Sequence, residues 1–292
     1  MMVVLLTALT LVAFAANSLL CRMALGGNLI DPASFTALRL VSGALALAPI
    51  SRMVAEAKEP QKTTGSWASG LALFAYAAAF SLAYVSLTTG TGALILFGAV
   101  QVTMIGAALK SGEHLGPVQW IGSLAAVGGL VYLVLPGISA PDPIGALLMC
   151  VAGIAWGVYS IRGKGVLAPV ILTAVNFRRA APWALVASAA AFSSLHLTPA
   201  GILLALTSGA ITSGLGYVLW YRALAGLTTT QASVVQLVVP VLAAFGGVAL
   251  LSEQVTVRLI SASALILGGV GMVVVRRMPM AVSVPAEDTG VG

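Results

Sequence analysis

The sequence predicts an all-α integral membrane protein with ten transmembrane helices arranged as two inverted five-helix repeats. Hydrophobic residues make up 60% of the 292 residues and charged residues only 8%, whereas soluble domains carry about 25% charged residues. Ten apolar runs follow one another along the chain, each close to the roughly 20 residues that an α-helix needs to cross a bilayer. The chain also repeats itself, because Leu87-Thr88-Thr89 returns 140 residues later as Leu227-Thr228-Thr229.

The predicted spans are separated by Asn, Gly, Pro and Thr residues, which are typical of turns. In order, they cover approximately 2–24, 33–52, 66–87, 90–110, 117–135, 143–164, 170–192, 200–224, 229–250 and 256–276. The first run has no basic stretch before it and no clear small-residue cleavage site, so we expect an uncleaved first helix. The segment 52–65 is a polar connection, and the tail 279–292 has the composition of disordered chain.

The repeat divides the predicted membrane body into residues 1–137 and 138–278. The same offset relates Arg22 to Arg162, Arg39 to Arg179, Glu113 to Glu253, and Gly128-Gly129 to Gly268-Gly269. Each half holds five spans, an odd number, so the second half enters the membrane in the opposite direction. Inverted repeats of this kind are typical of secondary transporters, whose substrate site lies near the midplane where the halves meet.

Lys and Arg in the connections predict the orientation. Nine of these residues lie on one side of the predicted topology, and only Arg22 and Arg258 lie on the other. Because basic residues concentrate in cytoplasmic loops, both termini are expected on the cytoplasmic side of a bacterial inner (plasma) membrane. This bias also explains the net charge of +6 without a nucleic-acid partner.

Three local features resemble the drug/metabolite transporter superfamily, specifically its EamA-type branch of ten-helix transporters. These are Asn17 to Arg22 followed by Arg39, the Thr-Thr turns at 88–89 and 228–229, and Glu113 and Glu253, each about 15 residues before a Gly-Gly pair. The resemblance reaches to about residue 277 and implies a secondary transporter. Family members of this size are commonly exporters of metabolites or amino acids, and the layout is most similar to that of aromatic amino-acid exporters.

All eight acidic residues fall in connections or in the tail, and none lies within a predicted span. This distribution disfavours a carboxylate proton relay in the pore, because such relays use intramembrane Asp, Glu or His. It also disfavours the cation efflux of the four-helix multidrug relatives, which resemble this chain but use a Glu in the first span. We therefore expect uniport or exchange.

Buried polar and aromatic side chains are the candidates for substrate binding. Amides inside hydrocarbon need a partner or a watery cavity, and aromatic pairs at i, i+4 share a helix face. The predicted substrate-binding residues are Asn17, Phe80, Tyr84, Trp156, Tyr159, Tyr217 and Gln236. Asn17 and Gln236 would contact the polar groups of the substrate and the aromatics would stack on it; plain packing or lipid contact is the alternative for the aromatics. By contrast, Trp67, Trp120 and Trp220 near span ends are expected in the interfacial belt.

Several other positions keep two interpretations. Arg39 and Arg179 either snorkel toward the membrane surface or meet a substrate carboxylate or phosphate. Glu113 and Glu253 either sit at the starts of the helices that follow them or form a gating ion pair with a base such as Lys110 or Arg258. Ser208, Thr212 and Gly216 recur every four residues and favour close helix packing, and Pro240 is expected to bend the ninth span.

No enzyme, cofactor or metal site is expected. Gly157 to Lys164 fails the Walker pattern, and His114 and His196 lie far apart without a cluster of Cys or acids. The expected function is export of small metabolites, above all amino acids including aromatic ones, by alternating access around a central cavity. The alternative is efflux of drugs or of neutral metabolites such as sugars or purines. The expected partners are a small-molecule substrate and the lipid bilayer, with the chain a monomer or a weak homodimer.

Overall fold

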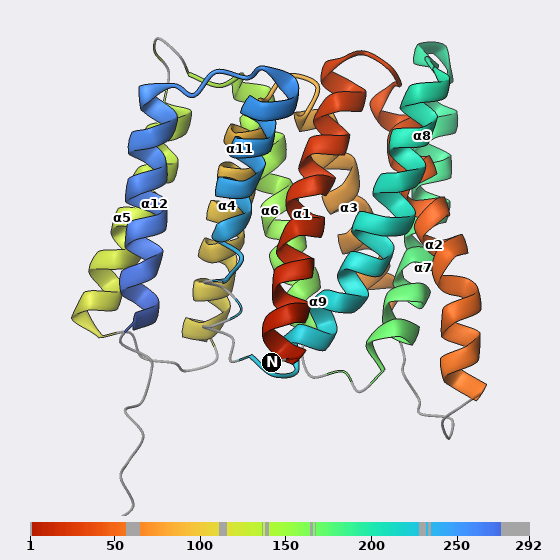
Figure 1. The fold of residues 1–292 in the computed structure, drawn as a ribbon, viewed down its shortest axis with the longest axis horizontal. Coiled ribbons are helices and arrows are strands. Elements are labelled where there is room, and N and C mark those ends of the chain that lie inside the picture. The colour runs from red at the N-terminus through yellow and green to blue at the C-terminus, as the bar shows by residue number, and fades with distance from the viewer. Residues whose placement is uncertain are drawn as a thin grey trace, which may run out of the picture.

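The computed structural model describes residues 2–56, 65–110, 116–135, 137, 140–163, 166, 168–227, 232 and 235–275. These residues form a bundle of helices that run up and down across its height (Figure 1). Helix α1 begins and α12 ends at the same end of the bundle. The predicted connection at 57–64, Glu113, Thr228, Thr229 and the tail fall outside the described residues.

The helices follow the predicted spans closely. Their bounds are α1 Met2–Gly26, α2 Pro32–Glu56, α3 Trp67–Ala83, α4 Thr89–Lys110, α5 Pro117–Val134, α6 Pro143–Gly163, α7 Pro169–Ala190, α8 Pro199–Thr207, η2 Ser208–Leu215, α9 Gly216–Leu224, α11 Val238–Leu251 and α12 Val257–Val275, with a short 3₁₀ turn η1 at Phe192–Ser194. Many begin with proline, whose fixed φ and missing amide suit the first helical position. Six of these spans are long and apolar enough to cross a membrane.

Helices at matching positions of the two halves pack in a symmetric pattern. Helix α2 packs on α7, α4 on α11, and α5 on α12, and each of these pairs joins a helix to its own repeat mate. Helix α3 packs on α6, and the matching contact joins the eighth span (α8, η2 and α9) to α1. The bundle therefore has the inverted-repeat architecture that the sequence predicts.

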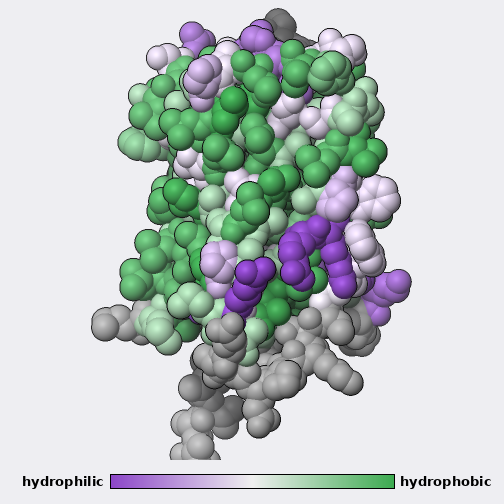
Figure 2. Space-filling model, turned by 90° about the vertical axis from the view of Figure 1, so that its right-hand side faces the viewer, coloured by the Kyte–Doolittle hydropathy of each residue, from purple (hydrophilic) through white to green (hydrophobic). Residues whose placement is uncertain are grey.

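The outer surface is apolar, as expected for a protein surrounded by lipid. Hydrophobic side chains cover most of the middle of the face shown in Figure 2, and hydrophilic residues gather toward its two ends. Trp67 and Trp120 are 59% and 48% exposed, in agreement with the predicted belt. The same prediction is wrong for Trp220, which is fully buried and packs edge-on against Phe14 with ring centroids 5.7 Å apart. Its helix face, rather than its distance from the span end, sets its position.

The eighth span is interrupted at its centre by a π-helix, η2. Gly209 explains how η2 approaches α2 closely, because a Cβ at this position would collide with the Arg39 carbonyl oxygen and with Ser42 Oγ. On the side that faces α1, Gly216 allows close packing, since a Cβ there would lie 3.2 Å from Cβ of Ala13. Of the small residues predicted for helix packing, Gly216 thus lies at a helix contact, and the hydroxyls of Ser208 and Thr212 contact Asn17 of α1.

The ninth span is also irregular. Gln236 and Leu237 form a turn, and α11 begins only at Val238, two residues before Pro240. Pro240 thus occupies the first turn of α11, where its missing amide breaks no helical hydrogen bond. The interruption lies on the amino-terminal side of the proline, at the position of the buried Gln236 side chain.

Candidate functional site

A cavity lies at the centre of the bundle, near the middle of the helices that surround it. Side chains from α1, α3 and α4 of the first half and from α6 and α9 of the second half form its wall. The lining residues are Phe14, Asn17, Ser18, Tyr76, Phe80, Leu96, Phe97, Trp156 and Tyr217. The free room among these side chains is close to that of one water molecule. We call this arrangement, which has no space for a substrate between the lining residues, the closed form.

Trp156 is the centre of the aromatic wall. Its ring centroid lies 4.7 Å from that of Tyr217, 5.1 Å from Tyr76 and 5.5 Å from Phe14. Tilted and edge-on ring pairs at such distances are favourable beyond their buried area. Gln236 accepts a hydrogen bond from Trp156 Nε1 at 3.3 Å and donates from Nε2 to the Ala232 carbonyl at 3.0 Å. The Gln236 amide, which does not line the cavity itself, therefore fixes the orientation of the Trp156 indole.

Asn17 forms the polar part of the wall. Its Oδ1 accepts hydrogen bonds from the hydroxyls of Ser208, Thr212 and Ser213 at 2.7, 3.1 and 3.3 Å. In an α-helix, residues 208 and 213 would point in clearly different directions. The wider turn of a π-helix, which bonds residue i to i+5, brings positions five apart onto one face. The π-helix thus allows three hydroxyls to converge on one amide oxygen.

Arg39 lies directly behind the aromatic wall. Its side chain is only 1% exposed, so the prediction that it snorkels to the membrane surface is wrong. Nε donates to Ser213 Oγ at 2.9 Å, and Nη2 donates to the hydroxyls of Tyr76 and Tyr217 at 3.1 and 2.9 Å. The guanidinium carbon also lies 5.2 and 5.1 Å from the ring centroids of Tyr76 and Phe80. Hydroxyls from three other elements hold the charge inside the bundle.

Arg179, the repeat mate of Arg39, lies in a different environment. Its Nη1 donates to the Gly65 carbonyl, and its guanidinium lies 5.7 Å from the ring centroid of the exposed Trp67. These contacts are at the end of the bundle where α3 begins. Arg179 thus behaves as a snorkelling residue, whereas Arg39 does not, although the sequence places them at matching positions.

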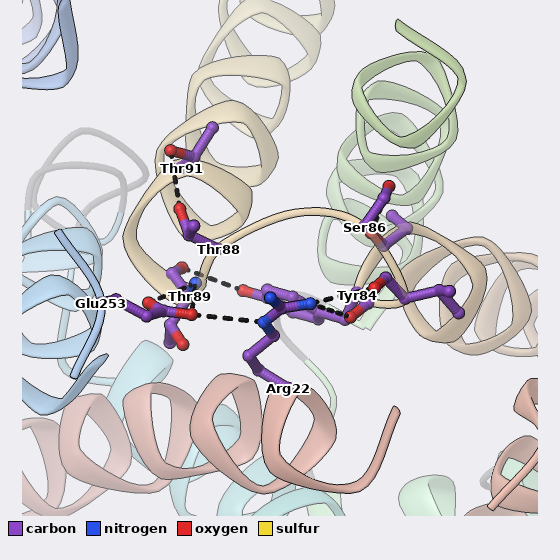
Figure 3. Close-up of polar contacts among 9 residues, drawn as sticks. Arg22, Tyr84, Ser86, Thr88, Thr89, Thr91 and Glu253 are labelled. Carbon is purple, nitrogen blue, oxygen red and sulfur yellow. Dashed lines mark hydrogen bonds and ion pairs between the residues drawn. The ribbon is translucent and has the colours of Figure 1, made fainter. Parts of the chain in front are cut away.

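A charged cluster joins the two halves at the opposite end of the bundle, where α1 ends and α4 begins. We call this the outer end, after its predicted orientation. Arg22 Nε lies 3.2 Å from Glu253 Oε1, and Arg22 Nη1 donates to the carbonyls of Tyr84 and Val85 at 3.1 and 3.0 Å. The Thr89 amide donates to both Glu253 oxygens at 3.0 and 2.8 Å. Figure 3 shows the carboxylate held between this amide and the guanidinium.

The cluster corrects two predictions for Glu253. It pairs with Arg22 and not with Lys110 or Arg258; Arg258 instead donates to the Leu135 carbonyl at 2.6 Å. Its charge lies at the start of α4 in the other half, not at the start of α12, which follows it in sequence. A carboxylate at a helix amino terminus is favourable because it meets free amides and the positive end of the helix dipole. The matching Glu113 lies outside the described residues.

The predicted substrate-binding residues occupy two layers. Asn17, Phe80, Trp156 and Tyr217 line the cavity. Tyr84, Tyr159 and Gln236 are buried behind it and contact lining residues: Tyr84 lies 4.7 Å from Phe80 and Tyr159 lies 5.6 Å from Trp156, centroid to centroid. Tyr84 also donates from its hydroxyl to the Thr89 carbonyl at 3.3 Å, and so connects the wall with the outer cluster.

The sequence prediction missed five residues of the cavity wall: Phe14, Ser18, Tyr76, Leu96 and Phe97. Tyr76 could have been found, because it lies one turn before Phe80 and extends the aromatic spacing that identified Phe80 and Tyr84. Phe14 and Phe97 carry no such signal in the sequence. Within the part of the chain that the structure describes, no three His, Cys, Asp or Glu side chains come close enough to hold a metal ion.

Three comparisons relate the chain to known proteins. The sequence profile of the EamA-like transporter family matches residues 143–275, which cover the second repeat. The uncharacterized protein PA1977 of Pseudomonas aeruginosa is 51% identical over 274 residues, or 94% of this chain and 95% of the relative. A crystal structure of a protein with 21% sequence identity has a TM-score of 0.62 and covers 92% of this chain and 99% of its own. This last likeness concerns the fold alone.

Proposed function

Because the chain belongs to the EamA-like transporter family of the drug/metabolite transporter superfamily, we propose that it exports small metabolites, above all amino acids including aromatic ones. Members of this family are transporters and not enzymes. The protein is therefore a multi-pass integral membrane transporter of a small molecule. The amino-acid substrate class and the direction of transport are the proposal.

The observation that carries the proposal is the central cavity itself. It lies near the middle of the spans, and both halves contribute to its wall. This is the position at which inverted-repeat transporters bind their substrates. The cavity has room for about one water molecule and the Arg22–Glu253 cluster joins the halves at the outer end, so substrate entry requires the halves to move apart. Alternating access provides that movement.

The composition of the wall supports an amino acid with an apolar or aromatic side chain. Tyr76, Phe80 and Trp156 offer rings for stacking, whereas Asn17 and Ser18 add polar groups on one side. A ligand with one apolar part and one polar part suits such a wall. The overall layout of the chain is also similar to that of the bacterial aromatic amino-acid exporter YddG.

The distribution of acids supports uniport or exchange. Among the described acids, Asp31 accepts from the Ser34 amide at the start of α2, and Asp142 accepts from the Gly145 amide at the start of α6. Glu253 belongs to the outer cluster. None of these three lines the central cavity, where a carboxylate would be needed to carry a proton with the substrate.

The proposed location is a bacterial inner membrane with both termini in the cytoplasm. The loop charges predict this orientation, and α1 begins at the same end of the bundle at which α12 ends. The relative from Pseudomonas aeruginosa supports a bacterial setting.

Flux measurements in proteoliposomes test the proposal. Vesicles containing the full chain are loaded with labelled phenylalanine or threonine, and efflux is followed with and without an imposed pH gradient. Saturable efflux that unlabelled amino acids inhibit is expected. If neither amino acid shows saturable flux under any gradient, the amino-acid proposal fails. Flux of sugars, purines or drugs in the same vesicles would then support the alternative of neutral-metabolite or drug efflux.

A further inference from the structure

Arg39 carries a charge that the surrounding described residues do not neutralise. Its Nε and Nη2 are hydrogen-bonded to Ser213, Tyr76 and Tyr217, whereas Nη1 is buried and has no hydrogen-bond partner among the described residues. The one ion pair in the described part of the chain is Arg22–Glu253. A buried guanidinium without an anion is costly, and an unpaired charge within a membrane span indicates a functional site.

The contacts of Arg39 connect this charge to the central cavity. Tyr76 and Tyr217, which accept from Nη2, both line the cavity, and so does Phe80, which lies under the guanidinium. A phenol can accept a hydrogen bond and still donate its own O–H. Because the hydroxyls of Tyr76 and Tyr217 are also hydrogen-bonded to each other, one phenol proton of the pair remains to be offered to an anion. The charge and the two hydroxyls form one group of donors behind and within the wall.

We propose that Arg39, with the hydroxyls of Tyr76 and Tyr217, is the receptor for the carboxylate of the transported substrate. The free N–H groups of Nη1 and one phenol O–H of the Tyr76–Tyr217 pair would donate to the carboxylate oxygens. The substrate's apolar part would then lie against Trp156 and Phe14. This inference rests on the proposed function and names the anionic group that the transporter selects.

A carboxylate fits these residues better than a larger or more highly charged anion. The site offers a single guanidinium, and the two N–H groups of its free Nη1 are enough to donate to one carboxylate. No Lys or Arg is among the described residues that line the cavity, and Arg39 behind the wall offers one positive charge, so a phosphate would keep an unbalanced charge.

Three ligands that share a phenyl ring test the charge requirement. Phenylalanine has a carboxylate and an ammonium group, 3-phenylpropionate has only the carboxylate, and phenethylamine has only the ammonium. Binding of each to the purified full chain is measured by calorimetry and by the change in tryptophan fluorescence. We expect both carboxylates to bind wild-type protein at least about tenfold more tightly than phenethylamine does, the size of a charge-assisted hydrogen bond.

The variants separate the role of Arg39 from general stability. Arg39→Gln should weaken carboxylate binding about 10- to 100-fold; phenethylamine binding should be unchanged or tighter, because the guanidinium no longer repels the ammonium. Arg39→Lys keeps the charge without the fork and should lose less affinity than Arg39→Gln. If Arg39→Gln does not fold, Arg39→Lys replaces it: a loss of carboxylate affinity in this variant supports the role of Arg39. Arg179→Gln is the matched control, because it removes the repeat-related arginine outside the cavity, and it should bind all three ligands like wild type.

The outcomes distinguish this inference from the proposed function. Carboxylate binding that is unchanged in a folded Arg39 variant, or phenethylamine binding as tight as that of phenylalanine, would overturn the role of Arg39. Failure of both carboxylates to bind wild-type protein would overturn it as well. If 3-phenylpropionate binds through Arg39 while phenylalanine neither binds nor shows flux, the receptor stands and amino-acid export falls. If phenylalanine shows saturable flux that is unchanged in the Arg39 variants, amino-acid export stands and the receptor role of Arg39 falls.

Discussion

Replacing Glu253 with Gln should release the outer end of the transporter. The substitution keeps the shape of the side chain and an oxygen that can accept from the Thr89 amide, but it removes the charge that faces Arg22. The Arg22 side chain is 22% exposed and that of Glu253 is 11% exposed. The pair is therefore better shielded than surface ion pairs, which contribute about 0.2–1 kcal/mol. A carboxylate at a partly buried helix end contributes up to about 2 kcal/mol more.

From these contributions we expect a loss of about 2–3 kcal/mol from the closed form. This corresponds to a rise of about 30- to 150-fold in the ratio of open to closed outer ends. We expect opening to separate Arg22 from Glu253 and to hydrate both, so the charge should stabilise only the closed form. The effect should therefore appear as an altered equilibrium between conformations, and not as a loss of substrate affinity within the cavity.

Cys21 provides the readout, because it precedes Arg22 in α1 and is fully buried in the closed form. Cys150 is the other free cysteine and is only partly buried, so the assay uses a Cys150→Ser background. The rate at which a membrane-impermeant maleimide modifies Cys21 follows the open fraction when opening and closing are fast. Glu253→Gln should raise this rate by about 30-fold or more, up to the rate of a freely exposed thiol.

Asp142→Asn is the matched control for this experiment. Asp142 also lies at the outer end and accepts from an amide at a helix start, but its side-chain partner is the hydroxyl of Ser86, not a base. Its loss should change the modification rate of Cys21 less than about threefold. A rate in Glu253→Gln within threefold of the parent, while SDS-unfolded protein reacts rapidly, would show that the ion pair does not hold the outer end closed.

Three further predictions concern packing, the polar wall and coupling. Gly209→Ala should lower the free energy of unfolding by about 1–3 kcal/mol, because its Cβ would meet the Arg39 carbonyl and Ser42 Oγ. Its control, Gly106→Ala, has open space around the new Cβ and should be neutral or stabilising by up to about 1 kcal/mol. Equal shifts of the melting temperature in the two variants would contradict this prediction. Asn17→Ala removes the acceptor of three buried hydroxyls and should lower the free energy of unfolding by about 1–3 kcal/mol and abolish most of the flux. Thr10→Ala, whose hydroxyl donates only to the Leu6 carbonyl among the described contacts, should lower stability less. A smaller loss of stability in Asn17→Ala than in Thr10→Ala, measured by thermal denaturation, would argue against the convergence of the three hydroxyls on Asn17. An imposed pH gradient should leave phenylalanine flux unchanged, since no described acid lines the cavity; uphill accumulation driven by protons would refute uniport and exchange.

The sequence was sufficient to predict the spans because apolar length and turn residues determine them locally. The bounds of most helices agree with the predictions within a few residues, and proline at many helix starts explains this accuracy. The π-helix at Ser208–Leu215 could not be predicted in this way, because its residues favour neither helix type. It depends on contacts with Asn17 and Arg39 from other helices.

The candidate site could be predicted only where a residue type is informative by itself. Asn17 and Trp156 were found because a buried amide and a mid-span indole are uncommon inside a membrane. Trp220 was misplaced, and the two interpretations of Arg39 could not be separated, because the direction in which a helix face points depends on the packing of its neighbours. The partner of Glu253 could not be predicted, since the repeat relates equivalent positions and carries no information on contacts such as the one with Arg22, 231 residues away.

The unneutralised charge of Arg39 has an electrical consequence for the cell. Arg39 remains in the protein during transport, so the cargo alone determines the charge that crosses the membrane. A zwitterionic amino acid carries no net charge, and its export would not respond to the membrane potential. A simple carboxylate would carry one negative charge outward, and a potential of 100 mV, negative inside, would drive this movement with about 2.3 kcal/mol, a concentration ratio of about 50. The same receptor would thus make export independent of voltage for one cargo and driven by voltage for the other.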